Sequence, residues 1–588
     1  MSTGQATHAN DSGNNNPPLS LEFATNPNPS ENNHILMNSG WLCGYRVENL
    51  TRPQVLPHQV ASYIDGATPF VEETNEILSE VVTTYSKRES NYVHHGWSVG
   101  AITTISPWTL SRIHATNQKN VEGVWVTKKN LVVRRRVQVL LQDLAPVPEF
   151  VAAIEEALGR STRFEKFQAV YHALSRWGDV VPLEIEIGSS LTSTDTEANL
   201  SQLPAVLYNN LAHLSILKTS SMIRKGASSN AKWGDWTWTT TDIPATEWRP
   251  ITIVTVAPTF SLLTNDLQAQ LAELYMERLS YTPPLTIDPI FGGREIYDGT
   301  HNTSRTISQV EIRIGSCIDR LSLIYRDGMV SRGGGEGGAE HSPFALANGE
   351  YITEMLTCND GNWLRGIQFV TDMGRCSVIY GQFEGILTIA RSKGGFLAGL
   401  IIRTRMNVYN NEAIAGIWGI WRHDYISRVP KENDVYSDYF GAKAQHGAGF
   451  NDRAIIGNSS AMYISSVEVH FGTEIDSIQF TYTDPKNYQN GKIKTACHGG
   501  TGGNYRKFEL EDGEHIVSIS GRCNEKVLTQ LCFGTNLGRT SEIYGIGGGQ
   551  EFSARAPQGE NGRYLRLQYI LGKSDSKLNG IMFAWTPI

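Results

Sequence analysis

The 588-residue chain is too long for one hydrophobic core, since single cores stop growing near about 250–300 residues, so several domains are expected. A formal net charge of -8 and the lack of a basic stripe argue against a nucleic-acid partner; the tightest basic run, residues 134–136, is interpreted as a solvated strand edge. Seven scattered cysteines without a CxxC pair argue against a disulfide framework or a zinc site and favour reduced thiols in a cytosolic store.

The first segment, residues 1–34, is rich in Asn, Ser, Pro and Gly and is predicted to be a disordered tail. It lacks a basic region followed by an apolar one, so no secretory signal peptide is expected. No apolar run reaches the roughly 20 residues of a membrane helix. We therefore expect a protein that is cytoplasmic, or secreted without such a signal, and that meets a membrane only by surface binding or refolding.

Residues 35–275 alternate between helical and strand-like patterns, which is typical of an α+β domain. Apolar residues at helical spacing predict helices over 74–85, 149–158, 165–174 and 266–274. Alternation of apolar and polar residues predicts strands over 93–105, 121–141 and 180–191.

The C-terminal half contains an internal repeat of short strands and glycine-rich turns, which predicts two copies of one all-β domain. The copies are expected at 285–422 and 438–588, divided by the linker-like stretch 429–434. The matching landmarks are Ile307–Gly315 with Ile464–Gly472, Ile318-Asp319 with Ile475-Asp476, 334–338 with 499–503, Gly349-Glu350 with Gly513-Glu514, Gly374-Arg375 with Gly538-Arg539, and 414–417 with 578–581. The GGxGG segments 334–338 and 499–503 are interpreted as turns, because no Lys-Ser/Thr and no helix follows them, as a phosphate loop requires.

This order of landmarks resembles the jacalin-related lectins. The resemblance implies a β-prism of three sheets in each copy, with a shallow carbohydrate site built by an N-terminal glycine loop and by an Asp in the closing strand. The glycines carried over are Gly292 and Gly293 in the first copy and Gly441 in the second, while the Asp is replaced by Ala415 and Asn579.

An alanine cannot accept a hydrogen bond from a sugar hydroxyl, whereas an asparagine keeps one carbonyl acceptor. The predicted carbohydrate site therefore lies in the second copy, at Gly441, Ser576, Lys577 and Asn579. The first copy, with Gly292 and Gly293, is expected to be weakened, altered or purely structural.

The N-terminal domain carries a second set of ordered landmarks. They are Trp177-Gly178-Asp179, then Gly188-Ser189, Trp248 and the segment Pro258 to Leu263. In this order they resemble the membrane-attack-complex/perforin (MACPF) family, closest to fungal relatives with a degraded signature. Asp179-Val180 stands where the family has Thr-His, and Ser189 replaces a glycine.

The MACPF resemblance implies a bent central sheet and two helical clusters that unfurl into membrane hairpins. The candidate hairpin segments are 91–118 and 195–226, and Gly178 and Gly188 are the candidate hinges of the sheet. A closed barrel satisfies every backbone group within a bilayer. Pro107 and Pro204 interrupt these segments, so buried core elements of a non-lytic domain are the alternative.

No catalytic motif stands out, and we expect neither an enzyme nor a bound cofactor or metal. His94-His95 is interpreted as a pair of sheet or surface histidines, and Glu184 and Glu186 as a solvated or partner-facing row. Three hypotheses remain: a glycan-targeted, pore-forming defence protein that assembles as a homo-oligomer on lipid membranes, a non-lytic glycan-recognition protein, and an enzyme with appended lectin modules.

Overall fold

The computed structural model describes residues 35–36, 39–48, 52–115, 121–200, 221–226, 239, 243–282, 295–444, 447–485, 491–559 and 562–588. The predicted disordered tail 1–34 lies outside them. The chain forms two compact units, one of Met1–Leu110, Asn120–Leu158 and Ala169–Ala269 and one of Ser111–Lys119, Gly159–Gln168 and Gln270–Ile588.

The N-terminal part of the chain consists of a sheet with helices. Its strands are β1 (Cys43–Arg46), β2 (Gln54–Gln59), β3 (Ala61–Tyr63), β4 (Phe70–Ser86), β5 (Glu122–Gln138), β6 (Leu144–Pro146), β7 (Val180–Thr196), β8 (Ser221–Lys225) and β9 (Arg249–Pro258). Its helices are α2 (Lys87–His94), α3 (Val99–Thr103), α4 (Pro107–Ala115), α5 (Pro148–Leu158), α6 (Arg163–Trp177), α7 (Glu197–Leu200) and α11 (Asn265–Glu277).

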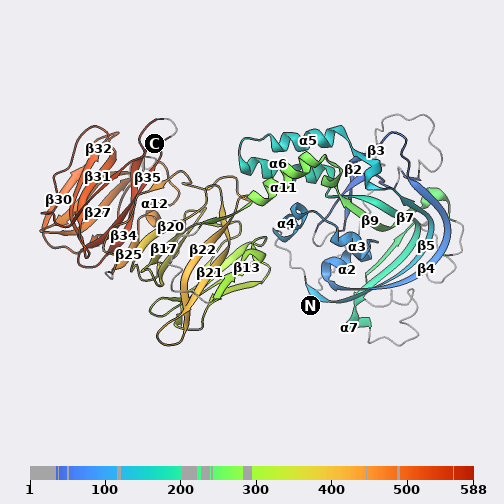
Figure 1. The fold of residues 1–588 in the computed structure, drawn as a ribbon, viewed down its shortest axis with the longest axis horizontal. Coiled ribbons are helices and arrows are strands. Elements are labelled where there is room, and N and C mark those ends of the chain that lie inside the picture. Colours follow the sequence, from blue (N-terminus) through green and yellow to red (C-terminus); the bar gives the residue numbers. More distant parts are fainter. Residues whose placement is uncertain are drawn as a thin grey trace, which may run out of the picture. The chain divides into compact units, whose positions relative to one another are not determined.

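Three long antiparallel strands, β4, β5 and β7, form the strongly curved part of the larger sheet, with β4 at its edge (Figure 1). Strands β3 and β6 pair in a separate two-stranded sheet. Beyond β7 lie β1, β8 and β9, and β2 pairs with β1. The strands predicted over 121–141 and 180–191 are confirmed as β5 and β7. The prediction of a helix over 74–85 is wrong, because these residues form most of β4. Their β-branched side chains, such as Val81 and Val82, fit an edge strand that is paired along its length to β5.

The strand predicted over 93–105 is also wrong, because this stretch contains the end of α2 and all of α3. Each helix begins at a serine whose hydroxyl accepts a backbone N–H, from Glu89 to Ser86 at 3.3 Å and from Ala101 to Ser98 at 3.0 Å. The helices predicted over 149–158, 165–174 and 266–274 are confirmed within α5, α6 and α11. None of the helices in the described part of the chain is long and apolar enough to cross a membrane.

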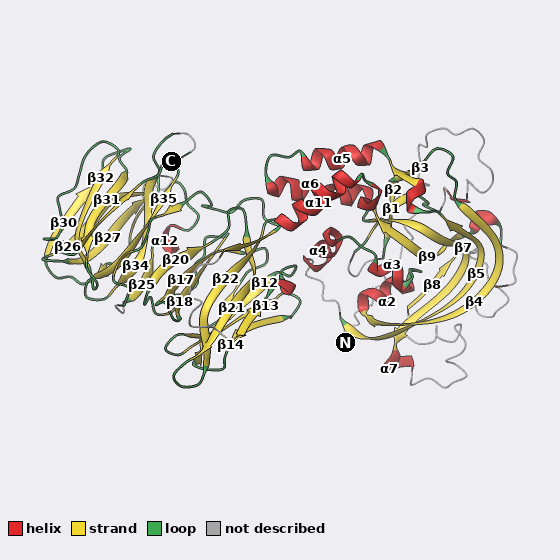
Figure 2. Cartoon of the chain, viewed as in Figure 1, coloured by secondary structure: helices red, strands yellow, loops and turns green. Residues whose placement is uncertain are grey.

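The C-terminal half contains two all-β modules (Figure 2). The strands of the first are β10 (Leu279–Thr282), β11 (Glu295–Asp298), β12 (Ile307–Ile314), β13 (Ile318–Tyr325), β14 (Val330–Gly334), β15 (Ala339–Glu340), β16 (Phe344–Ala345), β17 (Ile352–Asn359), β18 (Leu364–Thr371), β19 (Tyr380–Gly381), β20 (Ile386–Ala390), β21 (Phe396–Met406) and β22 (Glu412–Arg422). The second has β23 (Val435–Tyr436), β24 (Phe440–Gly441), β25 (Ala448–Asn451), helix α12 (Arg453–Ile456), β26 (Tyr463–Phe471), β27 (Ile475–Thr483), β28 (Lys492–Lys494), β29 (His498–Gly499), β30 (Asn504–Glu509), β31 (Ile516–Cys523), β32 (Leu528–Thr535), β33 (Gln550–Arg555), β34 (Arg566–Ser574) and β35 (Leu578–Thr586).

In the described residues each module has three antiparallel sheets around one core, which is the arrangement of a β-prism. The first module is built on β10-β22-β21-β11, β14-β13-β12-β15 and β19-β18-β17-β20. Because β10 pairs with β22 and β23 pairs with β35, both modules begin upstream of the predicted boundaries at 285 and 438. These opening strands are too short to give a clear alternation in the sequence.

The repeated Gly-Glu motif has a structural role in both modules. The buried carboxylate of Glu350 accepts from Arg375 Nη2 at 2.7 Å and from the Thr371 hydroxyl at 2.7 Å. Glu514 makes the same pair of contacts with Arg539 and Thr535, each at 2.7 Å. Burial alone would raise the pKa of Glu350, but Arg375 and the other donors lower it below its usual value.

The stretch 429–434 contacts both modules, because the Lys431 carbonyl accepts from Arg391 of the first module at 2.9 Å and the Lys431 ammonium group donates to Gln568 of the second. The side chains of Lys431 and Asp434 are almost completely buried, and the hydroxyl of Tyr436 donates to Glu354 of the first module at 2.5 Å. Asn451 of the second module donates to Gln368 of the first at 2.9 Å. Paired polar groups therefore join the two modules within one unit.

Candidate functional site

The predicted sugar ligand Asn579 lies at the start of β35, beside a bulge in its pairing with β34. Lys573 pairs with Gly580 and Ser574 with Leu578, so Asn579 falls between the two pairs. Its side chain is 1% exposed, and its Nδ2 donates to the Lys526 carbonyl at 3.3 Å. The Oδ1 atom is buried and has no hydrogen-bond partner among the described residues, so it can accept one more hydrogen bond.

The glycine that faces this oxygen is Gly447, which the sequence reasoning missed. A Cβ atom on Gly447 would lie 3.0 Å from Asn579 Oδ1, a tight contact that would require a small shift of one of the two groups. The predicted Gly441 instead faces the backbone, because its Cβ would lie 2.4 Å from the Asn579 carbonyl oxygen, and its φ is +124°. The backbone of Gly447 therefore packs beside Oδ1, whereas Gly441 permits β24 to approach β35.

The two other predicted ligands lie on the turn between β34 and β35. Lys577 is directed toward carboxylates, with its ammonium group paired to Asp476 and 3.9 Å from Glu474. This pairing gives Lys577 a structural contact that competes with ligand binding. Ser576 is exposed, and its hydroxyl lies 3.4 Å from Asp575, whose carboxylate also accepts the Lys577 backbone N–H at 2.9 Å. Asp575 is an exposed carboxylate that the sequence reasoning did not single out.

In the first module the equivalent position holds an apolar side chain. Ala415 lies between the pairs Arg403–Gly416 and Thr404–Ile414, which is the register of Asn579, and it is 1% exposed. The hairpin beyond it is longer, with the turn at 407–411 between β21 and β22, and its tip side chains are exposed. Gly292 and Gly293 lie outside the described residues. The acceptor of a sugar hydroxyl is therefore absent at Ala415.

The two candidate membrane segments leave the curved sheet at the same end. Ser86 at the end of β4 pairs with Glu122 at the start of β5, and Thr194 near the end of β7 pairs with Ser221 at the start of β8. The chain between these strands comprises 87–121 and 197–220. Of the predicted segments 91–118 and 195–226, the described parts contain α2, α3, α4, α7 and β8, while 116–118 and 201–220 lie outside the described residues.

Of the two candidate hinge glycines, Gly178 lies at the end of a helix and Gly188 lies inside a strand. Gly178 ends α6, with φ of +92° and its N–H bonded to the Leu174 carbonyl at 2.9 Å, which is a helix cap. Gly188 lies inside β7, where β9 pairing ends at Arg249 and β8 pairing begins two residues later. A Cβ on Gly188 would lie 2.0 Å from the Val132 carbonyl oxygen of β5, so only glycine fits at this point of the sheet.

Asp179, which replaces a family Thr, is buried and joins three elements. Its carboxylate accepts from Val47 N at 2.7 Å, just beyond β1, and from the Thr109 hydroxyl of α4 at 3.0 Å. Trp108, also in α4, packs against Tyr171 of α6 with a ring distance of 5.3 Å. The departure from the family signature therefore adds a contact that holds α4 in place.

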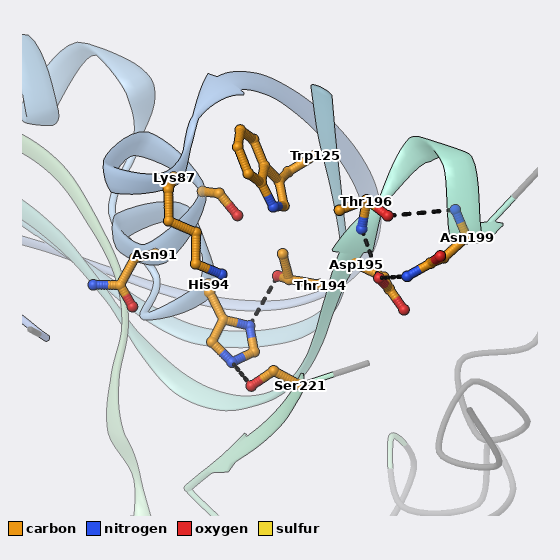
Figure 3. Close-up of a pocket in the computed structure, with 10 residues that line it drawn as sticks. Lys87, Asn91, His94, Trp125, Thr194, Asp195, Thr196, Asn199 and Ser221 are labelled. Carbon is orange, nitrogen blue, oxygen red and sulfur yellow. Dashed lines mark hydrogen bonds between the residues drawn. The ribbon is translucent and has the colours of Figure 1, made fainter. Parts of the chain in front are cut away.

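A pocket of about 300 Å³ lies where both segments leave the sheet (Figure 3). Lys87 and His94 line it from α2, Trp125 from β5, Asp195 from β7 and Ser221 from β8. His94 Nδ1 lies 2.9 Å from the Thr194 hydroxyl, and His94 Nε2 lies 2.9 Å from the Ser221 hydroxyl. The ring thus bridges two strands of the sheet.

The electrostatic surroundings keep His94 neutral. Burial, followed by the positive charges of His95, Lys87 and Lys225, lowers the pKa of His94 to about 4. Burial and the nearby Lys129 lower the pKa of Lys225 to about 8. A neutral imidazole has one N–H and one acceptor nitrogen, which suits a position between two hydroxyl groups.

Comparison with known families matches both halves of the chain. Residues 53–231 match the fungal MACPF-like domain, and residues 290–420 and 439–583 each match the jacalin-like lectin domain. The chain combines a fungal MACPF-like domain with two jacalin-like lectin domains. The mixed α/β fold of the N-terminal part and the two β-prisms agree with this assignment.

Two similar solved structures are each matched over about a quarter of this chain. The wild-type Malaysian banana lectin is 24% identical, covering 26% of this chain and 99% of its own, with a TM-score of 0.22. A mannose-binding jacalin-related lectin from Ananas comosus is 20% identical, with the same coverage and a TM-score of 0.21. The prostatic spermine-binding protein of Rattus norvegicus is 37% identical over 84 residues, which are 14% of this chain and 28% of that protein.

The residues considered for catalysis have partners within the MACPF-like sheet. Glu184 accepts from the Thr255 hydroxyl at 3.1 Å, and Glu186 accepts from Arg136 Nε at 3.3 Å. No cluster of three His, Cys, Asp or Glu side chains suited to a metal ion occurs within the described ranges. His94 and His95 lie in and directly after α2 rather than in a strand, which corrects the sheet interpretation.

Proposed function

We propose that this protein binds glycans on a target membrane through its second jacalin-like domain and that the MACPF-like domain then perforates that membrane. Carbohydrate binding is what the jacalin-like domains imply. The observation that supports a site in the second domain is the buried, unpartnered Oδ1 of Asn579 beside Gly447. A sugar hydroxyl is a donor of the right kind for such an acceptor.

The order of the strands in the sheet supports insertion of the two segments into a membrane. Extension of 87–121 would lengthen β4 and β5, and extension of 197–220 would lengthen β7 and β8, which lie in the order β4-β5-β7-β8. Each segment exceeds the roughly 18–22 residues that a membrane hairpin of two strands needs. One chain would supply only four strands, so a closed barrel would require a homo-oligomer. Under this proposal the protein acts at the target membrane, as a defence protein would, and no catalysis is involved.

A non-lytic recognition protein is the second candidate, and one observation favours it. The helix α4 begins at Pro107, buries Trp108 at 3% exposure and is bonded to Asp179 through Thr109. These contacts would have to be lost before residues 87–121 could straighten. In this case the MACPF-like domain would be a scaffold for the lectin domains.

Dye-filled vesicles test the proposal. A glycan array first identifies a sugar that the protein binds, with mannose as the first choice because a similar lectin from Ananas comosus is mannose-binding. Vesicles with and without that sugar are then mixed with the protein. Leakage and ring-shaped oligomers on the glycan-bearing vesicles alone are the expected result. Binding without leakage would contradict perforation and leave the recognition function.

A further inference from the structure

We infer that His94 and Lys225 form a clasp that ties α2, in the first membrane segment, to β8, at the end of the second, so that a rearrangement of one segment destabilises the other. The clasp is defined as His94 and His95 on the side of α2 and Thr194, Ser221 and Lys225 on the side of β7 and β8. Its functional meaning rests on the proposed membrane function. The coupling between the two segments does not depend on that function, because it can be measured in the protein in solution, without membranes.

The first half of the clasp is a chain of hydrogen bonds through the imidazole of His94. Thr127 of β5 bonds to the Thr194 hydroxyl at 2.8 Å, and Thr194 bonds to His94 Nδ1 at 2.9 Å. His94 Nε2 bonds to Ser221 at 2.9 Å. Thr194 and Ser221 are directly opposite each other in the β7–β8 ladder. One side chain from α2 therefore closes over a cross-strand pair that includes the first residue of β8 (Figure 3).

The second half of the clasp is the ammonium group of Lys225, at the other end of β8. Lys225 Nζ donates to the His95 carbonyl at 2.7 Å and to the Pro250 carbonyl at 3.2 Å. His95 is the C-terminal cap residue of α2, where carbonyl groups lack partners within the helix. A cation at this end also interacts favourably with the helix dipole. Lys225 thus stabilises the helical state of the first segment from a strand of the second.

The backbone after α2 packs closely against β9 and Lys225, and a side chain does not fit at Gly96. A Cβ on Gly96, directly after His95, would lie 2.1 Å from the Ile251 carbonyl oxygen and 3.1 Å from Lys225 Nζ. The Gly96 carbonyl accepts from Ile253 N at 2.8 Å. The chain after α2 is therefore held between β9 and Lys225.

These contacts assign His94 and Lys225 as positioning residues of the proposed transition. Straightening of α2 would withdraw the imidazole from Ser221 and the His95 carbonyl from Lys225. Both losses remove partners from β8, whose ladder with β7 covers only residues 221–225. Conversely, a shift of Ser221 or Lys225 during extension of 197–220 would remove contacts that stabilise α2. The two segments should therefore be released together.

Hydrogen exchange of the full-length soluble protein, without membranes, tests the coupling. In Lys225→Met we expect amide exchange in residues 90–96 to rise on the order of tenfold, because the hydrogen bond from the Lys225 ammonium group to the His95 carbonyl is lost. In Ser221→Ala, an exposed site that the fold tolerates, we expect a smaller rise in α2. His94→Leu should raise exchange in residues 221–225. Each effect would appear in the segment that was not mutated.

Ser98→Ala is the matched control. It removes a bond of 2.6 Å from Ser98 to the Val254 carbonyl and the cap of α3, but it touches neither β8 nor Lys225. Exchange should rise in α3 and stay unchanged in 221–225. Exchange changes confined to the mutated segment in all clasp variants would overturn the clasp. Coupled exchange in a protein that never causes vesicle leakage would support the clasp and contradict the proposed perforation, so the two failures are distinguishable.

Discussion

Replacing Asn579 with leucine should separate glycan binding from stability. The Asn579 side chain is 1% exposed and its Oδ1 has no partner in the described residues, and such a buried acceptor costs about 1–3 kcal/mol. Its one bond, from Nδ2 to the Lys526 carbonyl, is long at 3.3 Å and contributes about 0.5 kcal/mol. We therefore expect the free energy of unfolding of Asn579→Leu to be unchanged or about 1 kcal/mol higher, a rise in Tm of about 2–4 °C.

The same substitution should weaken glycan binding. A hydrogen bond from a sugar hydroxyl to Oδ1 contributes about 1 kcal/mol, and a leucine also fills the space next to Gly447. The dissociation constant should rise about tenfold, which corresponds to 1.4 kcal/mol. Thermal unfolding and calorimetric titration with the sugar found on a glycan array provide the two measurements.

Asn302→Leu is the matched control for this experiment. Asn302 lies in the first jacalin-like domain, is 1% exposed, and also has a buried Oδ1 without a partner in the described residues. Its substitution should have a similar effect on stability and none on glycan binding. A loss of more than about 2 kcal/mol in Asn579→Leu, or glycan affinity equal to wild type, would refute the reasoning.

Three further outcomes are expected. Arg375→Met leaves the buried Glu350 carboxylate without its cation and should cost about 3 kcal/mol in urea unfolding; a cost below about 1 kcal/mol would contradict the pairing. Gly188→Val places a Cβ 2.0 Å from the Val132 carbonyl oxygen and should lower the free energy of unfolding by about 3 kcal/mol, whereas a stable variant would show that β7 can shift. Between about pH 6.5 and 4 the unfolded chain binds a proton at His94 that the folded chain excludes, so acidification from pH 7 to 5 should lower the free energy of unfolding by about 2 kcal/mol. In His94→Leu this part of the pH dependence should vanish, and its persistence would exclude His94 as the cause.

The lectin half could be predicted well because its repeat reflects local requirements. Gly349-Glu350 and Gly513-Glu514 recur because a buried carboxylate must face an arginine 25 residues later, at Arg375 and Arg539. Turn glycines recur for the same kind of reason, since Gly334 and Gly499 have positive φ in equivalent turns. Gly447 was missed because its role depends on Asn579, more than a hundred residues away.

The N-terminal half was harder because periodicity alone misleads on short stretches. Residues 74–85 have apolar side chains at helical spacing, yet the run Val81–Thr84 has β-branched side chains throughout and forms an edge strand. The helices α2 and α3 carry a serine cap at Ser86 and Ser98, which was the available signal. The clasp between His94 and Ser221 joins residues 127 positions apart, and no local pattern reports such a contact.

Dye release from glycan-bearing vesicles by the wild-type protein and by Asn579→Leu tests the central proposal most directly. We expect the wild-type protein to release dye only when the recognised sugar is present on the vesicle. Asn579→Leu should require about tenfold more protein for the same release. Equal release from vesicles with and without the sugar would contradict glycan targeting by the second jacalin-like domain.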